Sequence, residues 1–89
     1  MNSAIYLTDK KIHTIMLSIM QIGEHAGIVW RELHDHVEPQ TFEKLKNATG
    51  LDVIQLSAAL GWLARENKLS IHENGDEVMF GLSPMNYYI

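Results

Sequence analysis

Apolar residues recur every three or four positions along much of this chain, which is the spacing of one face of an α-helix. The densest such stretch runs from Leu51 to Lys68. Its apolar positions are Val53, Leu56, Leu60 and Leu63, extended round the helix by Ile54, Ala58, Ala59 and Trp62. Asp52 and Gln55 fit a capping box at the start, and Asn67 suits a left-handed end. We therefore predict one helix here, which is so apolar that it is either buried on most sides or keeps part of its surface for a partner.

A second helical pattern precedes it. The repeating positions step by three and four and are Ile12, Ile15, Ile19, Ile22, Ala26, Val29 and Leu33. As one helix from Lys10 to His36 this segment would be about 40 Å long. That exceeds the width of so small a domain, so its first half would pack on a second copy of the chain. The alternative is two helices divided at Gly23 and Gly27, because a glycine costs up to about 1 kcal/mol in a helix interior.

If the first half of this helix packs on a second copy of the chain, its first turns form the interface. The predicted interface residues are Ile12, Ile15, Ile19 and Ile22. Their heptad spacing is typical of helices that pack along a shared apolar edge. We expect a homodimer formed through this N-terminal helix.

A short helix and a turn separate the two long patterns. Pro39 ends the first pattern, because the residue before a proline avoids the helical region. Thr41 is a plausible N-cap for the helix Phe42 to Thr49, and Gly50 suits a left-handed C-terminal residue. Only Gly50 and Leu51 then precede the Asp52 cap, so the chain is expected to form a helix-turn-helix.

The apolar period changes to two after Lys68. The alternating positions are Leu69 and Ile71, followed by Val78, Phe80 and Leu82. The pair Asn74–Gly75 between them is a strong signal for a β-hairpin turn, and Pro84 stops the second strand. The predicted fold is mainly α with a small β-hairpin, a winged helix-turn-helix of three helices and a wing. Residues 1–9 are expected to be a tail and residues 10–89 a single domain.

Three sequence blocks extend this prediction to a family. They are GEHAGIVW at Gly23–Trp30, FEKLKNAT at Phe42–Thr49 and GWLARE at Gly61–Glu66, of which the last is the most specific. With them the chain resembles a small bacterial winged-helix family of unknown function over roughly residues 22–82. The resemblance implies the fold and a place among domains similar to DNA-binding ones. The extension at residues 1–21 looks longer than the usual start of that family.

Composition narrows the class of protein. The chain has 89 residues, no cysteine and a formal charge of −4, which excludes disulfides and disfavours strong non-specific attraction to nucleic acid or anionic lipid. Polar residues interrupt the apolar run from Ile12 to Ile22, so it is too short and too polar for a membrane span. No signal-peptide cleavage site follows it. A cytoplasmic protein without membrane contact is expected.

The resemblance raises the question of double-stranded DNA. In a winged helix the second helix of the pair usually enters the major groove. The candidate contacts are Lys44, Lys46, Gln55, Ser57, Arg65 and Lys68. Against them, Glu73, Asp76 and Glu77 would place negative charge on the wing, where phosphates approach.

The sequence is therefore compatible with two functions. The first is a DNA-binding transcriptional regulator that acts as a dimer. The second is a winged-helix module that binds a protein and no DNA, which the apolar helix and the tail Tyr87–Ile89 favour.

Other chemistries find no support in the residue pattern. His34 and His36 are two positions apart, which on a helix directs them about 200° away from each other. The sequence offers no nucleophile with a base partner, no glycine-rich phosphate loop and no paired catalytic carboxylates. We predict no enzyme activity, no metal, no cofactor and no small-molecule substrate.

Overall fold

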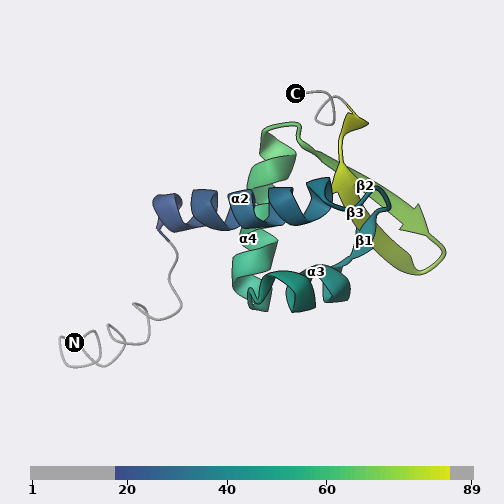
Figure 1. The fold of residues 1–89 in the computed structure, drawn as a ribbon, viewed down its shortest axis with the longest axis horizontal. Helices are drawn as coiled ribbons and strands as arrows, with labels where there is room; N and C mark the ends of the chain where they lie inside the picture. Colours follow the sequence, from purple (N-terminus) through teal and green to yellow (C-terminus); the bar gives the residue numbers. More distant parts are fainter. Residues whose placement is uncertain (1–17, 85–89) are drawn as a thin grey trace, which may run out of the picture.

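The computed structural model describes residues 18–84, which form three helices and a three-stranded sheet. In chain order these are α2 (Ile19–His34), β1 (Gln40–Thr41), α3 (Phe42–Thr49), α4 (Val53–Arg65), β2 (Leu69–Asn74) and β3 (Glu77–Leu82). Helices α2 and α4 cross, α3 packs beside both of them, and the β2–β3 hairpin projects from one end as the wing (Figure 1). The winged helix-turn-helix prediction is confirmed.

Helix α2 begins later than the sequence pattern suggested. Ser18 has φ −81° and ψ 163°, which is extended backbone, and it serves as the N-cap. Its hydroxyl accepts the Gln21 N–H at 3.1 Å while the Gln21 side chain accepts the Ser18 N–H at 3.0 Å. The predicted helix from Lys10 to His36 therefore does not run unbroken through Ser18, because this capping box fixes a helix start there.

The division at Gly23 and Gly27 is wrong, since α2 continues through both glycines to His34. The helix is stable in spite of the two glycines, because its residues Ala26, Val29 and Leu33 are buried against the rest of the domain. Tertiary packing of one apolar face outweighs a propensity cost of about 1 kcal/mol per glycine.

Only two of the four predicted dimer residues lie within the described residues 18–84. Ile12 and Ile15 lie outside the described residues, as do residues 1–9 of the predicted tail. Ile19 is 74% exposed, and Ile22 is half-buried. The first turn of α2 thus presents apolar surface to solvent, and the interface stays a prediction.

The sequence signals correctly place the starts of both helices of the helix-turn-helix and the end of the first one. Thr41 Oγ1 accepts the Lys44 N–H at 3.1 Å, and Gly50 is left-handed at φ 76°. The capping box of Asp52 and Gln55 is present at the start of α4.

The end of α4 is closed by two backbone hydrogen bonds. Asn67 is left-handed at φ 58° and donates its N–H to the Ala64 carbonyl at 3.1 Å. Lys68 donates to the Leu63 carbonyl at 2.9 Å. This bond pair satisfies two carbonyls that would otherwise be free at the helix end.

The sheet contains one strand and one turn position that the sequence pattern did not predict. The short β1 pairs antiparallel with β3, which gives the strand order β1-β3-β2. In the hairpin Asn74 pairs with Glu77, so the two turn residues are Gly75 and Asp76, one position later than Asn74–Gly75. Gly75 has φ 67°, which a residue without a Cβ adopts at little cost.

The core lies where the three helices meet the base of the sheet. Its buried apolar residues are Ala26, Val29, Leu33, Leu45, Leu51, Leu56, Ala59, Leu60, Leu63 and Leu82. The prediction that Val53 belongs to the inward face of α4 is wrong, since Val53 and Ile54 are each 54% exposed. They occupy the first turn of α4, and no described element covers their side chains fully.

Candidate recognition surface

The two lysines of α3 lie in the helix that precedes α4. Lys44 is exposed and Lys46 is half-buried. Both positions follow from the amphipathic pattern of α3, in which Leu45 is buried between them. Their ammonium groups are available at this surface, although a role in binding phosphates stays a prediction.

Gln55 was chosen as a candidate DNA contact because of its residue type, but its side chain also has a structural role. Its Oε1 accepts the Asp52 N–H at 3.0 Å, and its own N–H donates to Asp52 Oδ1 at 2.7 Å. The carboxamide is therefore held back against the first turn of α4, and only its NH₂ group is left for a ligand. The capping box was visible in the sequence and already competes with base reading at this position.

Arg65 and Lys68 lie at the opposite end of α4 from Gln55. Ten residues separate Gln55 from Arg65, which is about 15 Å along a helix axis. Lys68 lies beyond the last turn and pairs with Glu66 at 3.6 Å. The structure thus distributes the six predicted DNA contacts over α3, the first half of α4, its last residue and the segment after it, instead of along one face.

The outward face of α4 carries almost no polar groups. The exposed residues that succeed one another along it are Ile54, Ser57, Gly61 and Ala64, and we name them the α4 stripe. Ser57 alone has a hydrogen-bonding side chain. The sequence predicted that this helix is either buried on most sides or keeps apolar surface for a partner, but it did not show which positions are left exposed. The signal was the excess of apolar positions over what one buried face requires.

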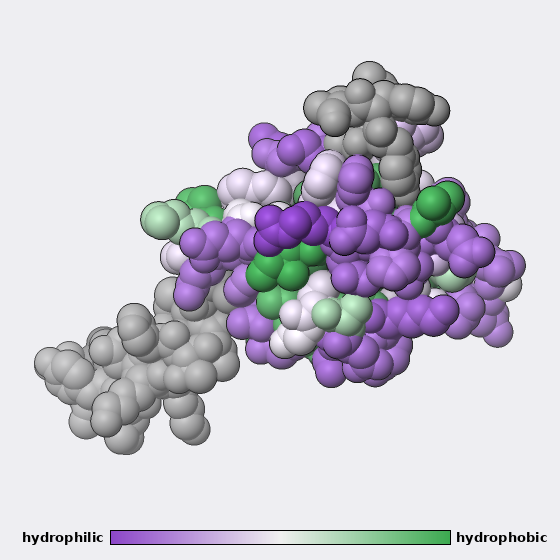
Figure 2. All heavy atoms as spheres, in the orientation of Figure 1, coloured by the Kyte–Doolittle hydropathy of each residue, from purple (hydrophilic) through white to green (hydrophobic). Residues whose placement is uncertain are grey.

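The wing tip is acidic. Glu73, Asp76 and Glu77 are exposed in and beside the hairpin turn, and residues 69–84 contain no Lys or Arg. Figure 2 shows hydrophilic residues over most of the wing, with a small apolar area between α2 and α3. Among residues 18–84, ten Asp and Glu stand against five Lys and Arg. This surface repels phosphates and attracts cationic groups.

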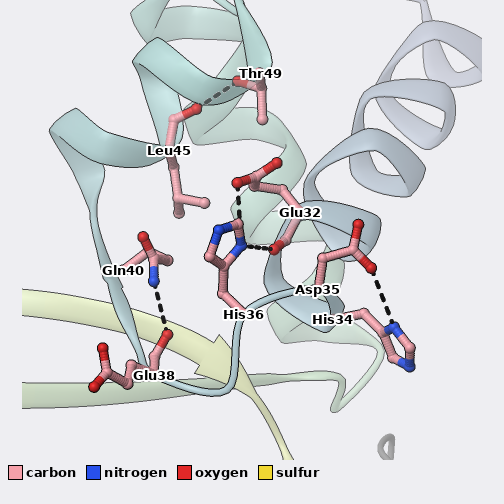
Figure 3. A network of polar contacts seen from close by, with 8 residues as sticks. All are labelled: Glu32, His34, Asp35, His36, Glu38, Gln40, Leu45 and Thr49. Atoms are coloured by element: carbon pink, nitrogen blue, oxygen red, sulfur yellow. Dashed lines mark hydrogen bonds and ion pairs between the residues drawn. The ribbon is translucent and has the colours of Figure 1, made fainter.

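His34, the last residue of α2, and His36, which follows it, take part in local polar contacts (Figure 3). His36 Nδ1 lies 2.9 Å from the Glu32 carbonyl oxygen and 3.2 Å from Glu32 Oε2, whereas His34 Nδ1 lies 3.6 Å from Asp35 Oδ1. The two rings are directed away from each other. In the part of the chain from 18 to 84 no three His, Asp or Glu side chains gather as metal ligands would. No helix of that part has the length and apolar character to cross a bilayer.

Comparison with known proteins assigns the family. The model of a winged helix-turn-helix domain family, DUF2582, matches residues 16–82. A solution NMR structure of protein BT2368 from Bacteroides thetaiotaomicron is 30% identical and has a TM-score of 0.65, with 71% of this chain and 76% of that chain covered. No curated protein matches. From the match to most of its length and the observed fold, this chain belongs to the DUF2582 family of winged helix-turn-helix domains.

Proposed function

We propose that this winged helix is a protein-interaction module whose docking surface is the α4 stripe. The observation that carries the proposal is the chemistry of that stripe. Ile54, Gly61 and Ala64 are exposed at the positions where a DNA-reading helix presents polar side chains. An apolar stripe gains free energy by leaving water, whereas it offers base edges nothing to bind.

The stripe and the net negative charge of residues 18–84 favour a basic amphipathic helix as the partner. Gly61 and Ala64 have little or no side chain, so a partner backbone can approach α4 closely there. Acidic residues predominate over basic ones by ten to five in residues 18–84. A helix with an apolar face and flanking lysines would match both the stripe and the sign of the charge.

Double-stranded DNA is the second candidate, for a transcriptional regulator. It is favoured by the exposure of α4, the helix that winged domains commonly insert into the major groove. Arg65 is exposed in its last turn, and Lys44 is exposed on the preceding helix, α3. The acidic wing and the capping role of Gln55 weigh against it.

A homodimer is part of the regulator proposal. Ile19 and Met20 in the first turn of α2 are 74% and 77% exposed. Two such residues side by side form apolar surface that a second copy could cover. Light scattering of the protein and of an Ile19→Lys variant measures this directly. A concentration series in which the mass of the unaltered protein never exceeds that of the monomer would remove the dimer from the proposal.

One pair of titrations separates the two candidates. The first follows the anisotropy of a labelled random duplex at two salt concentrations. The second follows a labelled synthetic helix of leucines and lysines. We expect the synthetic helix to bind at both salt concentrations, because burial of its apolar face does not depend on salt. We expect the duplex to show no salt-sensitive binding. Duplex binding that collapses at the higher salt would instead establish the regulator.

The matched variants are Gly61→Arg and Asn47→Arg. Both add one positive charge to an exposed helix position, but only Gly61 belongs to the α4 stripe. Gly61→Arg should abolish binding of the leucine–lysine helix, while Asn47→Arg should leave it nearly unchanged. Equal losses in both variants would show that the helix binds by charge alone.

A further inference from the structure

A groove lies between α2 and the last turns of α4, away from the α4 stripe. It encloses about 400 Å³, within the usual range for small-ligand sites. The α2 side contributes Gly23, Gly27, Trp30 and Arg31, and the other side contributes Trp62 and Lys68. Neither candidate function above uses this groove.

The glycines of α2 keep the groove open. A methyl group at Gly27 would meet no other atom within 4 Å, so nothing in the domain's own packing requires a glycine there. A methyl group at Gly23 would lie 3.6 Å from Cζ2 of Trp62, an ordinary contact. Two glycines in one helix cost about 1 kcal/mol each. At Gly27 the missing side chain leaves room beside the α2 backbone, whereas at Gly23 it allows the Trp62 ring to approach that backbone.

The aromatic walls are held in place before any ligand arrives. Trp30 stacks on His34 with ring centroids 4.8 Å apart and planes at 16°. Trp62 lies against the α2 backbone at Gly23. These are the two tryptophans of the sequence. Fixed aromatic rings bind another flat ring with little loss of side-chain entropy.

The rim of the groove is more cationic than the rest of the surface. Arg31 and Lys68 are two of the five Lys and Arg in residues 18–84. Lys68 is paired with Glu66, which also lines the groove. Arg31 has no ion-pair partner within the described residues 18–84. Its planar guanidinium is therefore available to a carboxylate, which it can bind through two parallel hydrogen bonds.

We propose that this groove binds a small planar aromatic carboxylate, with its ring against the indoles of Trp30 and Trp62 and its carboxylate on Arg31. The occupant touches α2 and the end of α4 together, so binding stabilises the packing of these two helices by mass action. Because α4 also carries the stripe of the proposed function, the groove is placed to act as an effector site. The test of ligand binding is independent of that function.

Both tryptophans line the groove, so intrinsic fluorescence reports on it without a label. We expect 2-naphthoate to change the tryptophan emission saturably, and neutral 2-naphthamide to bind about tenfold more weakly or worse, as one lost charge-assisted hydrogen bond predicts. Indole N–H signals in NMR spectra should shift for both tryptophans. Equal binding of the acid and the amide would overturn the assignment of the carboxylate to Arg31.

Three variants test the geometry. Arg31→Gln should weaken 2-naphthoate about tenfold, whereas Arg65→Gln, an exposed arginine outside the groove, should leave it unchanged. Gly27→Leu should fill the groove and abolish binding, and Gly61→Ala, which likewise meets no atom within 4 Å, is its control on α4. Unaltered affinity in Gly27→Leu, with the fold confirmed by circular dichroism, would overturn the proposal.

Two other occupants are distinguished by the same measurements. A chain shortened to end at Pro84 should bind 2-naphthoate as the full chain does. A large gain in affinity on shortening would mean that residues 85–89 occupy the groove and would overturn the proposal. Competition between 2-naphthoate and self-association, followed by light scattering, would assign the groove to a second copy and overturn it as well.

Discussion

The two faces of α4 have similar residue types and different tasks. The inward face carries Leu56, Ala59, Leu60 and Leu63, all buried. The outward face carries the α4 stripe, which is exposed although it contains only one polar side chain. Apolar character on the inward face is explained by the core. On the outward face the fold gives it no task, and this is why we assign the stripe to a partner.

The sharpest way to break this comparison is to shorten one side chain on each face. Leu56 is fully buried, so Leu56→Ala should lower the free energy of unfolding by about 2–5 kcal/mol through lost burial and a cavity. Ile54 is 54% exposed, and Ile54→Ala should cost less than about 1 kcal/mol. Urea unfolding followed by circular dichroism measures both. Similar losses for the two variants would show that the stripe is part of the core.

The cap at the start of α4 should have the next largest effect. Asp52→Ala removes the acceptor of the Gln55 N–H and should cost about 1 kcal/mol. Asp52→Asn keeps a capping side chain and should cost much less, which separates the cap from the charge. Thermal unfolding of both variants checks this. An equal loss in Asp52→Asn would assign the effect to the carboxylate charge.

A substitution in the α4 stripe should stabilise the domain. Gly61 lies in the middle of α4 with no atom within 4 Å of an added methyl group, so Gly61→Ala should raise the free energy of unfolding by up to about 1 kcal/mol. Gly50→Ala is the contrasting variant, because Gly50 has φ 76° and should lose stability. A loss in Gly61→Ala would mean that the outward face is not open.

Substitutions at the wing tip should have the smallest effect on the free energy of unfolding and the largest effect on binding to DNA. Glu73→Lys with Glu77→Lys changes exposed positions only, so the free energy of unfolding should move by less than about 0.5 kcal/mol. The exchange reverses two charges at the wing tip and should create salt-sensitive affinity for random duplex. Glu24→Lys with Glu38→Lys is the matched control, with the same net charge away from the wing tip. Equal duplex binding by the two double variants would show that net charge decides, and not the wing.

Elements marked by local chemistry were predictable from the sequence. The capping box of Asp52 and Gln55, the left-handed Gly50 and Asn67, and the hairpin after Lys68 are all present, because each depends on residues within a few positions of one another. The family blocks and the order of elements also led to the correct fold. The candidate surface was less predictable, because Gln55 was assigned to DNA contacts by residue type although the predicted capping box already engages its side chain.

The failures all involve contacts between segments distant in the chain. The sequence could not show that α2 would pass through Gly23 and Gly27, since the compensating burial comes from α4 and the sheet. It placed Val53 in the core, because helical period does not say where the neighbouring elements end. The strand β1 has two residues and exists only through its pairing with β3.

The amino-acid sequence by itself therefore determined the identity and order of the local elements, their caps and the negative charge of the wing. The tertiary structure alone decided which apolar residues are covered. Burial depends on what lies opposite a side chain, and that neighbour is set by the crossing of α2 and α4. The positions of the α4 stripe and of the groove beside Gly27 both depend on that crossing, so these positions became visible only in three dimensions.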